Sequence, residues 1–103
     1  MKLDILRDIG YELIDEEGYD ECRIFFNKKL KGGVLGKCQY YENYHIIRIA
    51  LTNKEKKLSD SELILHLVHE IAHLNIYRHD KYHISYTKYL YRKIKKKLER
   101  FKK

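Results

Sequence analysis

The 103-residue sequence contains no proline, only five glycines and only two cysteines. This composition, with apolar residues spread along the whole chain, predicts a compact globular fold rather than a linker or a disordered segment. No stretch approaches eighteen uncharged apolar residues, so we expect no membrane span. The opening segment MKLDILRDIGYELIDEEG carries acids every few positions and lacks the apolar core of a secretory signal, which predicts a cytoplasmic location.

The two cysteines, Cys22 and Cys38, stand sixteen positions apart and form no Cys-x-x-Cys pair. This spacing argues against a zinc knuckle and against a dithiol redox motif. A disulfide between neighbouring strands stays open as an alternative. Because the chain shows no export signal, we expect two reduced thiols in the core.

The net charge of +7 is concentrated at the C-terminal end. Residues 92–103, RKIKKKLERFKK, hold eight basic residues and one acidic residue, which accounts for the whole net charge. Apolar residues in this region recur at the spacing of an amphipathic helix: Leu90, Ile94, Leu98 and Phe101. The basic side chains then form either a solvated helix face or a face that binds phosphate groups. In the second case the candidate DNA contacts are Arg92, Lys93, Lys95, Lys96, Lys97 and Arg100.

Hydrophobic periodicity predicts a single α+β domain over residues 1–103. Apolar residues at three- and four-residue spacing over 3–17 predict a helix that ends at Gly18. Three short apolar segments then predict a three-stranded antiparallel sheet: residues 21–30, 33–41 and 44–51. A glycine turn separates the first two strands and residues 42–44 separate the next two. A polar loop over 52–60 follows the sheet.

Two helices are predicted after the sheet. Ser59 and Glu62 have the Ser-x-x-Glu spacing of a capping box, in which each side chain satisfies the other residue's exposed backbone donor. The apolar-periodic stretch from Leu63 to Ile76 therefore starts as a well-marked helix. A final helix is expected to begin near Asp80 and to run into the basic end of the chain.

The segment HEIAH at residues 69–73 matches the pattern H-E-x-x-H. His69 and His73 are four positions apart, so both imidazoles project from one helix face and can bind one zinc ion. Glu70 lies beside the first ligand, where its carboxylate can take a proton from a zinc-activated water and pass it to a leaving amine. Helices also carry paired histidines without metal. Here the flanking apolar residues predict a buried helix, in which these polar groups need a shared partner.

A catalytic zinc takes three protein ligands, and His79 is the leading candidate for the third. An unbroken helix would rotate His79 by about 600° relative to His73, well off its face. We therefore expect the chain to turn between Leu74 and Arg78. Asn75 is the expected stopping residue because asparagine tolerates the left-handed conformation that ends helices.

Other histidines near the motif are alternatives or bystanders. Asp80 is expected to cap the last helix, which leaves His79 just outside it and able to reach the metal. His83, one turn into that helix, is the alternative third ligand, and Asp80 is a further one through oxygen. His66 shares the His73 face but sits a turn too early, and His45 is interpreted as an ordinary edge-strand residue.

The segment LILHLVHEIAHLNIYRHDKYH resembles the active-site helix of the SprT-like zinc metallopeptidases and of the related YgjP-like (WLM-type) hydrolases. The resemblance covers roughly residues 20–95 and implies a minimal zincin-like fold. It also implies that His69, His73 and His79 are zinc ligands, that Glu70 is the catalytic base and that the substrate is a protein or peptide. The chain departs from the family in lacking a zinc ribbon of paired cysteines. The family carries an aromatic residue soon after the third histidine. In this chain His83 and Ile84 occupy those positions, unless Tyr86 takes the place of the aromatic residue.

Two other functions remain open. The YbeY-like metal-dependent endoribonucleases share the histidine spacing but carry glycine after the first histidine, so Glu70 discriminates against that class. A nucleic-acid-binding module could instead use the basic helix together with tyrosines for base stacking: Tyr86, Tyr89 and Tyr91. The two ideas combine in a Spartan-type protease that acts on DNA-associated proteins. Tyr82 and Tyr86 are the candidates for stabilising an oxyanion.

Overall fold

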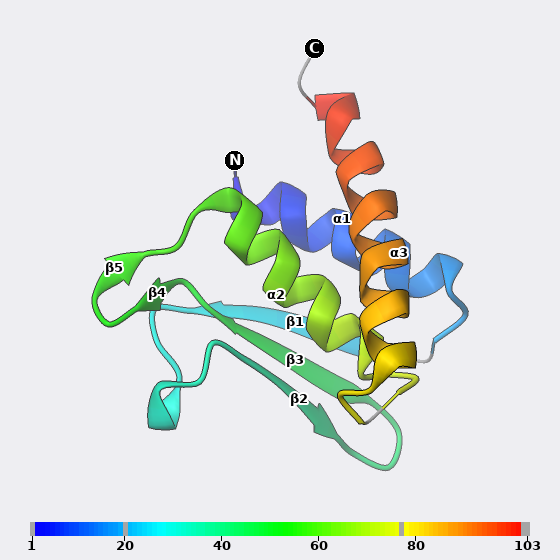
Figure 1. The fold of residues 1–103 in the computed structure, drawn as a ribbon, viewed down its shortest axis with the longest axis horizontal. Coiled ribbons are helices and arrows are strands. Elements are labelled where there is room, and N and C mark those ends of the chain that lie inside the picture. Colours follow the sequence, from blue (N-terminus) through cyan, green and yellow to red (C-terminus); the bar gives the residue numbers. More distant parts are fainter. Residues whose placement is uncertain (1, 20, 77, 102–103) are drawn as a thin grey trace.

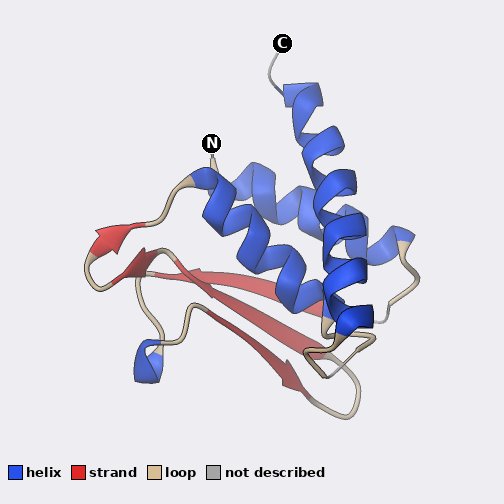
Figure 2. Ribbon diagram, in the orientation of Figure 1, coloured by secondary structure: helices blue, strands red, loops and turns tan. Residues whose placement is uncertain are grey.

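Three helices and a small sheet form an α+β domain (Figures 1 and 2). The computed structural model describes residues 2–19, 21–76 and 78–101, with only the backbone of Phe101. Helices α1 (Leu3–Glu16) and α2 (Asp60–Ala72) lie on one face of the sheet, and α3 (Lys81–Leu98) packs across both. Helix α3 continues into the short helix η2 (Glu99–Phe101). Three helices are present where helices were predicted, although α2 ends at Ala72 and not at Ile76. Gly18, with φ of 79°, follows the end of α1.

The main sheet has three strands: β1 (Cys22–Asn27), β2 (Gly36–Tyr40) and β3 (His45–Ala50). Their order is β1-β3-β2, with β2 antiparallel and β1 parallel to β3. The predicted antiparallel sheet is wrong, because β3 lies between the other two strands. The chain reverses twice between β1 and β3, so these neighbours run in the same direction. The more continuously apolar sequence of β3 fits a central strand, and Ile47, Ile49 and Ala50 are buried.

The predicted polar loop over 52–60 contains a second, two-stranded sheet. Strands β4 (Thr52–Asn53) and β5 (Lys56–Lys57) pair antiparallel. Between them Lys54 and Glu55 have φ of 50° and 70°, the left-handed conformation of a two-residue hairpin turn. The predicted glycine turn is confirmed as the helix η1 (Lys31–Gly33), in which Gly32 and Gly33 have φ of 78° and 74°.

The hydrophobic core lies between the helices and one face of the sheet. Its side chains are almost fully buried and come from α1, β1, β3, α2 and α3: Leu6, Leu13, Ile24, Ile47, Ile49, Leu67, Ile71 and Leu90 among others. Gly10 lets α1 approach the sheet closely, because a Cβ there would lie 2.8 Å from the Ile24 side chain. The tight packing fixes α2 over β2 and β3, which determines where its C-terminal end points.

Cys22 and Cys38 are both free thiols. They lie on β1 and β2, which are separated by β3, so their backbones are about 10 Å apart, two strand spacings. This separation exceeds the reach of a disulfide. Burial raises the pKa of Cys22 to about 12, which makes it an unreactive core residue.

Helix α3 contributes Leu90, Ile94 and Leu98 to the core, as predicted from their spacing. The side chain of Phe101, the fourth predicted member, lies outside the described residues. In the part of the chain that the structure describes, no helix combines the length and apolar composition needed to cross a membrane.

Candidate metal centre

The helix that carries the H-E-x-x-H segment starts at the predicted capping box. The Ser59 hydroxyl accepts a hydrogen bond from the Glu62 backbone N–H at 3.2 Å, and the Glu62 carboxylate accepts one from the Ser59 N–H at 3.2 Å. Leu63, Ile64, Leu67, Val68 and Ile71 are buried along the helix. His69 and Glu70 therefore lie in the last turn of a helix that is fixed at both its start and its packed face.

The end of α2 differs from the prediction at Asn75. The helix ends at Ala72 with His73 as its C-cap in the right-handed conformation, and no residue of the following turn, 74–76, has a positive φ. Three short-range bonds tighten it: His73 N–H to Glu70 O (3.1 Å), Leu74 N–H to Ile71 O (3.0 Å) and Asn75 N–H to Ala72 O (3.2 Å). Such i to i−3 bonds satisfy the last carbonyls without a left-handed residue. The predicted change of direction before Arg78 is still present.

Asp80 caps α3 as predicted and fixes the segment that holds His79. Its Oδ1 accepts hydrogen bonds from the backbone N–H groups of Tyr82 at 3.0 Å and His83 at 3.1 Å. The carboxylate is therefore used as a helix cap, and this hydrogen bonding argues against the alternative of Asp80 as an oxygen ligand. His79, one residue earlier, is exposed and lies outside the helix.

The Nε2 atoms of three histidines converge on one point. His73 Nε2 lies 2.9 Å from His79 Nε2 and 3.3 Å from His69 Nε2. The Nε2 atoms of His69 and His79 are 3.1 Å apart. Nitrogens at three corners of a tetrahedron with zinc–nitrogen bonds of 2.0–2.1 Å lie about 3.3 Å apart. The three predicted ligands thus already have nearly the spacing that one tetrahedral ion requires.

Hydrogen bonding and burial leave these nitrogens as lone-pair donors. The Nδ1 of His73 lies 2.9 Å from the Ile76 carbonyl, which only accepts, so Nδ1 carries the proton and Nε2 is free to bind a metal. Burial, followed by the charges of His83, His73 and His79, lowers the pKa of His69 to about 4. Burial also lowers the pKa of His73. Converging neutral imidazoles suit zinc and other first-row divalent ions.

His83 is the fourth histidine of the cluster and is 1% exposed. With His69 and His73 it forms a second group of ring nitrogens, all within 4.8 Å of one another, that could hold a metal ion. Its ring stacks on His73 at 4.2 Å between centroids. Its Nε2 lies 3.2 Å from the His69 carbonyl, to which it must donate, so His83 is left with only Nδ1 as a ligand atom. The contact closest to a zinc geometry is therefore that of His79.

Glu70 is 7% exposed and lies against Gly36 at the start of β2. A Cβ at Gly36 would come within 2.7 Å of a Glu70 carboxylate oxygen. The missing side chain therefore makes the space that the carboxylate occupies. Burial raises the pKa of Glu70 to about 7, which is the range of an effective general base at neutral pH.

Two residues of this site were not predicted from the sequence. One is Gly36, and the other is Tyr40, whose hydroxyl donates a 2.8 Å hydrogen bond to the backbone carbonyl of His73. Tyr40 therefore ties the end of β2 to the end of α2. A glycine inside a strand signals a close approach of another group, but the sequence does not say which group approaches.

The remaining candidates lie elsewhere or have other partners. Tyr86 donates to Glu17 at 2.8 Å and also contacts Tyr19, while Tyr82 is 64% exposed under the Lys81 ammonium. Neither tyrosine makes a described hydrogen bond in the histidine cluster. The Nδ1 of His66 is buried without a hydrogen-bond partner among the described residues, and His66 takes no part in the described ring contacts of the cluster. The interpretation of His45 as an edge-strand residue is wrong, because His45 begins the central strand β3; its ring makes an edge-to-face contact with Tyr40.

The basic face of α3 is partly neutralised by α1. Lys93 binds Glu16 at 3.2 Å and Glu17 at 3.0 Å. Lys97 binds Glu12 and Glu16, and Arg100 binds Glu12 at 3.0 Å. Three of the six candidate DNA contacts therefore already have carboxylate partners within the domain, which leaves Arg92, Lys95 and Lys96.

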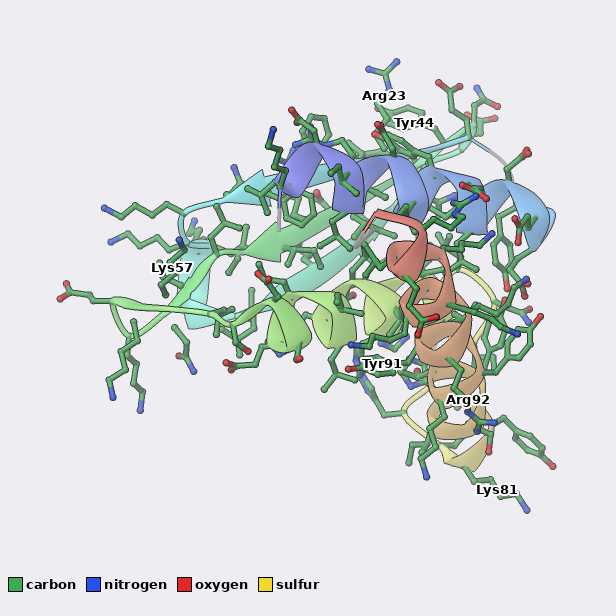
Figure 3. All side chains as sticks on the ribbon, turned by 90° about the horizontal axis from the view of Figure 1, so that it is seen from above. Arg23, Tyr44, Lys57, Lys81, Tyr91 and Arg92 are labelled. Atoms are coloured by element: carbon green, nitrogen blue, oxygen red, sulfur yellow. The ribbon has the colours of Figure 1, made fainter. Side chains whose placement is uncertain are left out.

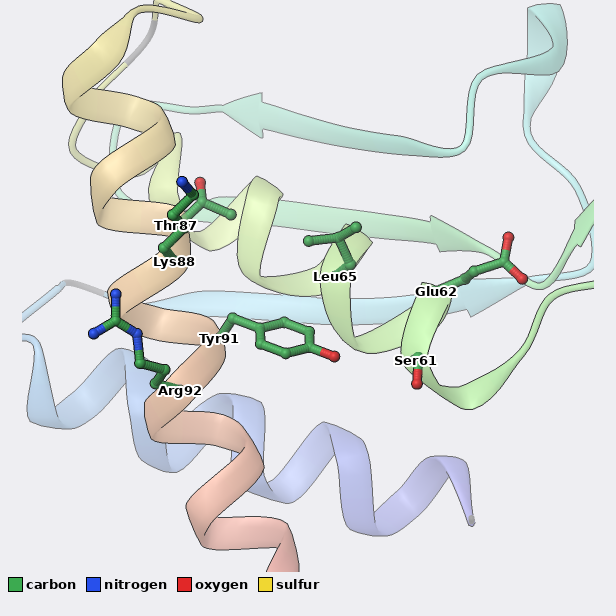
Figure 4. Close-up of a pocket in the computed structure, with 7 residues that line it drawn as sticks. All are labelled: Ser61, Glu62, Leu65, Thr87, Lys88, Tyr91 and Arg92. Atoms are coloured by element: carbon green, nitrogen blue, oxygen red, sulfur yellow. The ribbon is translucent and has the colours of Figure 1, made fainter.

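A separate hollow of about 390 Å³ lies between α2 and α3, and Figure 4 shows the side chains that line it. It is lined by Leu65, Thr87, Tyr91 and Arg92, together with the polar start of α2. Thr87 lies one turn after His83, and no histidine lines the hollow. The hollow is therefore separate from the histidine cluster.

No protein-family model matches the sequence, and neither a curated protein nor a solved structure shows significant similarity to it. Function is therefore inferred from the geometry of the site.

Proposed function

We propose that the protein is a zinc-dependent metallopeptidase of the SprT-like or YgjP-like type with a minimal zincin-like fold. His69, His73 and His79 would hold the zinc ion and Glu70 would be the catalytic base. The observation that supports the proposal best is the convergence of three Nε2 atoms within 3.3 Å beside a buried carboxylate. Zinc bound there would supply a Lewis acid and an activated water.

The protein's own groups fit the steps that peptide hydrolysis requires. Glu70 is placed by α2 and by the space at Gly36, so its carboxylate can accept a proton and return it to the leaving amine. His73 is held in one tautomer by the Ile76 carbonyl. His83 holds the backbone of the last turn of α2 through the His69 carbonyl. These contacts preorganise the site before substrate binds.

Strand β2 offers an edge on which an extended substrate can pair. It lies at the end of the sheet order, with β3 on its other side. The Leu35 carbonyl accepts from Ala50 N–H. Since alternate residues of an antiparallel pair face the partner strand, Gly36 and Cys38 direct their backbone groups toward the free edge. A peptide added there would lie beside Glu70.

The proposal is tested with tag-free protein in a protease assay on unfolded casein, with zinc content measured alongside. Glu70→Gln should keep its zinc and lose at least 100-fold in kcat, because general-base catalysis contributes about 10²–10⁴. Glu42→Gln, on the exposed turn before β3, is the matched control and should be fully active. An active Glu70→Gln enzyme would contradict the proposal, and zinc-dependent cleavage of RNA by that variant would favour the ribonuclease class instead.

DNA contact through α3 remains a second prediction. Arg92 and Lys96 are exposed and lie on the part of the helix that α1 does not neutralise. Truncation before residue 92 would be an unsuitable test, because it removes Ile94 and Leu98 from the core. Arg92→Glu with Lys96→Glu should lower both the affinity for duplex DNA and its dependence on salt. Binding without salt dependence would exclude this role.

A further inference from the structure

Six exposed lysines lie on two loops at the end of the sheet opposite α3, and only one acid accompanies them. They are Lys28, Lys29, Lys31, Lys54, Lys56 and Lys57, with Glu55 as the acid. Within the described ranges 2–19, 21–76 and 78–101, none of the six has an ion-pair partner, unlike Lys93 and Lys97 of α3. Figure 3 shows Lys57 at the far end of the molecule from Arg92 and Lys81. Among the described residues, this end therefore carries a second concentration of unpaired positive charge, separate from the one that Arg92, Lys95 and Lys96 form on α3.

The two loops border an open cleft of about 770 Å³ lined by residues 28–34 and 52–55, which we call the lysine cleft. Backbone hydrogen bonds hold its two walls together. Leu51 N–H donates to the Asn27 carbonyl at 2.8 Å, and the Thr52 N–H and hydroxyl both donate to the Lys28 carbonyl, at 3.1 Å and 2.6 Å. The cleft is therefore built on hydrogen-bonded backbone, with exposed lysine side chains along it.

The lysine cleft is continuous with the edge strand next to Glu70. Val34 lines the cleft and lies two residues before Gly36, which touches the Glu70 carboxylate. Figures 1 and 4 show η1 beyond the free edge of β2, at the end where the strand begins. An extended chain advances about 3.3 Å per residue. A peptide paired with β2 at Gly36 would therefore reach the cleft within two to five residues.

We propose that the lysine cleft binds acidic side chains of the polypeptide substrate, two to five residues from the scissile bond. This inference rests on the proposed peptidase function. An added strand that runs antiparallel to β2 carries the residues C-terminal to the scissile bond toward the cleft, so acidic residues are selected on that side. Lysine ammonium groups are point charges without the fixed fork of arginine, so the cleft selects charge and not a particular sequence.

The lining favours an acidic polypeptide over a nucleic acid. No arginine and no aromatic side chain lines the cleft, so it offers no platform for stacking bases. The backbone pairing available along β2 suits an extended polypeptide and has no counterpart in a nucleic acid strand.

The test uses three fluorogenic peptides of equal length: one neutral, one with four acidic residues at positions two to five C-terminal to the scissile bond, and one with them N-terminal. Wild type should cleave the C-terminal acidic peptide with at least tenfold higher kcat/KM than the neutral one, mainly through KM. Moving from 50 to 300 mM salt should reduce this preference. The N-terminal acidic peptide should behave like the neutral one.

Charge-reversal variants locate the preference. Lys28→Glu, Lys29→Glu and Lys31→Glu combined should remove or invert it, with folding checked by circular dichroism. The control combines Lys2→Glu, Arg23→Glu and Lys88→Glu, three exposed positions outside the cleft with the same change in net charge, and should retain the preference. Equal cleavage of all three peptides by wild type would overturn the proposal, as would an equal loss in both variants. The proposal would also be overturned if wild type showed no preference among the peptides but bound single-stranded DNA in a salt-dependent way, and the cleft variant lost this binding.

If wild type cleaves none of the peptides, the peptidase function itself is contradicted. A binding assay then tests the lysine cleft separately. The acidic peptide labelled with a fluorophore then reports binding by anisotropy in wild type and in Glu70→Gln. Binding to both, lost only in the cleft variant, would support the cleft as an acidic-peptide site apart from catalysis. Equal binding by the cleft variant would overturn it.

Discussion

His73 Nε2 lies 2.9 Å from His79 Nε2, although His73 ends α2 and His79 belongs to the segment before α3. This contact closes the histidine cluster and depends on two features that fix the intervening chain. The first is the tight turn after Ala72, and the second is the Asp80 cap on α3. The proposed third ligand, His79, is thus positioned by the boundary between two helices.

The two candidate third ligands should respond differently to substitution. His79→Ala should lower zinc affinity at least 100-fold, because it removes a converging nitrogen. His83→Gln keeps an N–H donor for the His69 carbonyl and should change the affinity by no more than about tenfold. Competition with a chelating dye measures both affinities. A larger loss in His83→Gln than in His79→Ala would assign the third ligand to His83.

Gly36→Ala should reduce activity without removing the metal. A Cβ would lie 2.7 Å from the Glu70 carboxylate, so the carboxylate must move, and a displacement near 1 Å can cost about 100-fold in rate. The backbone of Gly36 has no positive φ, so alanine should not strain the strand. Zinc content and the melting temperature should stay near wild type while kcat falls at least tenfold. Unchanged kcat would show that Glu70 tolerates displacement.

In the metal-free protein, Glu70 should lower the free energy of unfolding by an amount that depends on pH. Burial raises its pKa from 4.5 to about 7, so the folded state disfavours the charged carboxylate. The contribution of Glu70 to stability is therefore greatest below pH 4.5 and falls as pH rises from 4.5 through 7, by about 3 kcal/mol. Glu70→Gln should therefore exceed wild type in stability at pH 8, and this difference should vanish near pH 4.5. Urea unfolding in the presence of a chelator, with Glu42→Gln as control, measures it.

Glu17 should be a main link between α1 and α3. Its carboxylate accepts hydrogen bonds from Tyr86, Tyr89 and Lys93. Burial opposes ionisation, but these partners prevail and lower the pKa of Glu17. Glu17→Gln should destabilise the fold by roughly 1–3 kcal/mol at pH 7. The difference should shrink as pH falls from 4.5 through the lowered pKa of the folded state, because the unfolded state takes up the proton first; below the folded-state pKa the carboxylate is protonated in both states. A difference constant from pH 7 to pH 3 would contradict this role.

Local sequence signals predicted the three helices and the placement of His69 and His73 at the end of α2. The Ser59 and Glu62 capping box, the His69 and His73 spacing and the Asp80 cap each act within four residues, so the sequence contains all their partners. The change of direction before Arg78 was predicted correctly. Its mechanism was not, because short-range bonds after Ala72 replace a left-handed Asn75.

Other errors concern contacts between distant segments. Strand periodicity shows which residues are buried but not which strand lies in the middle, so the parallel pairing of β1 with β3 was missed. The space at Gly36 for Glu70 depends on how α2 packs over β2. The charge of the C-terminal helix likewise looked free in sequence, whereas Lys97 pairs with acids more than 80 positions earlier.

Cobalt titration of tag-free, metal-free protein tests the metal centre most directly, because cobalt replaces zinc and its visible absorption reports coordination geometry. Wild type should bind one equivalent with the intense absorption of a tetrahedral site, and one equivalent of zinc should displace it. His73→Ala should bind far more weakly, since His73 Nε2 contacts both other ligands. Wild-type protein that binds no equivalent of either metal, or binds it equally well without His73, would contradict the assignment of His69, His73 and His79 as the metal centre.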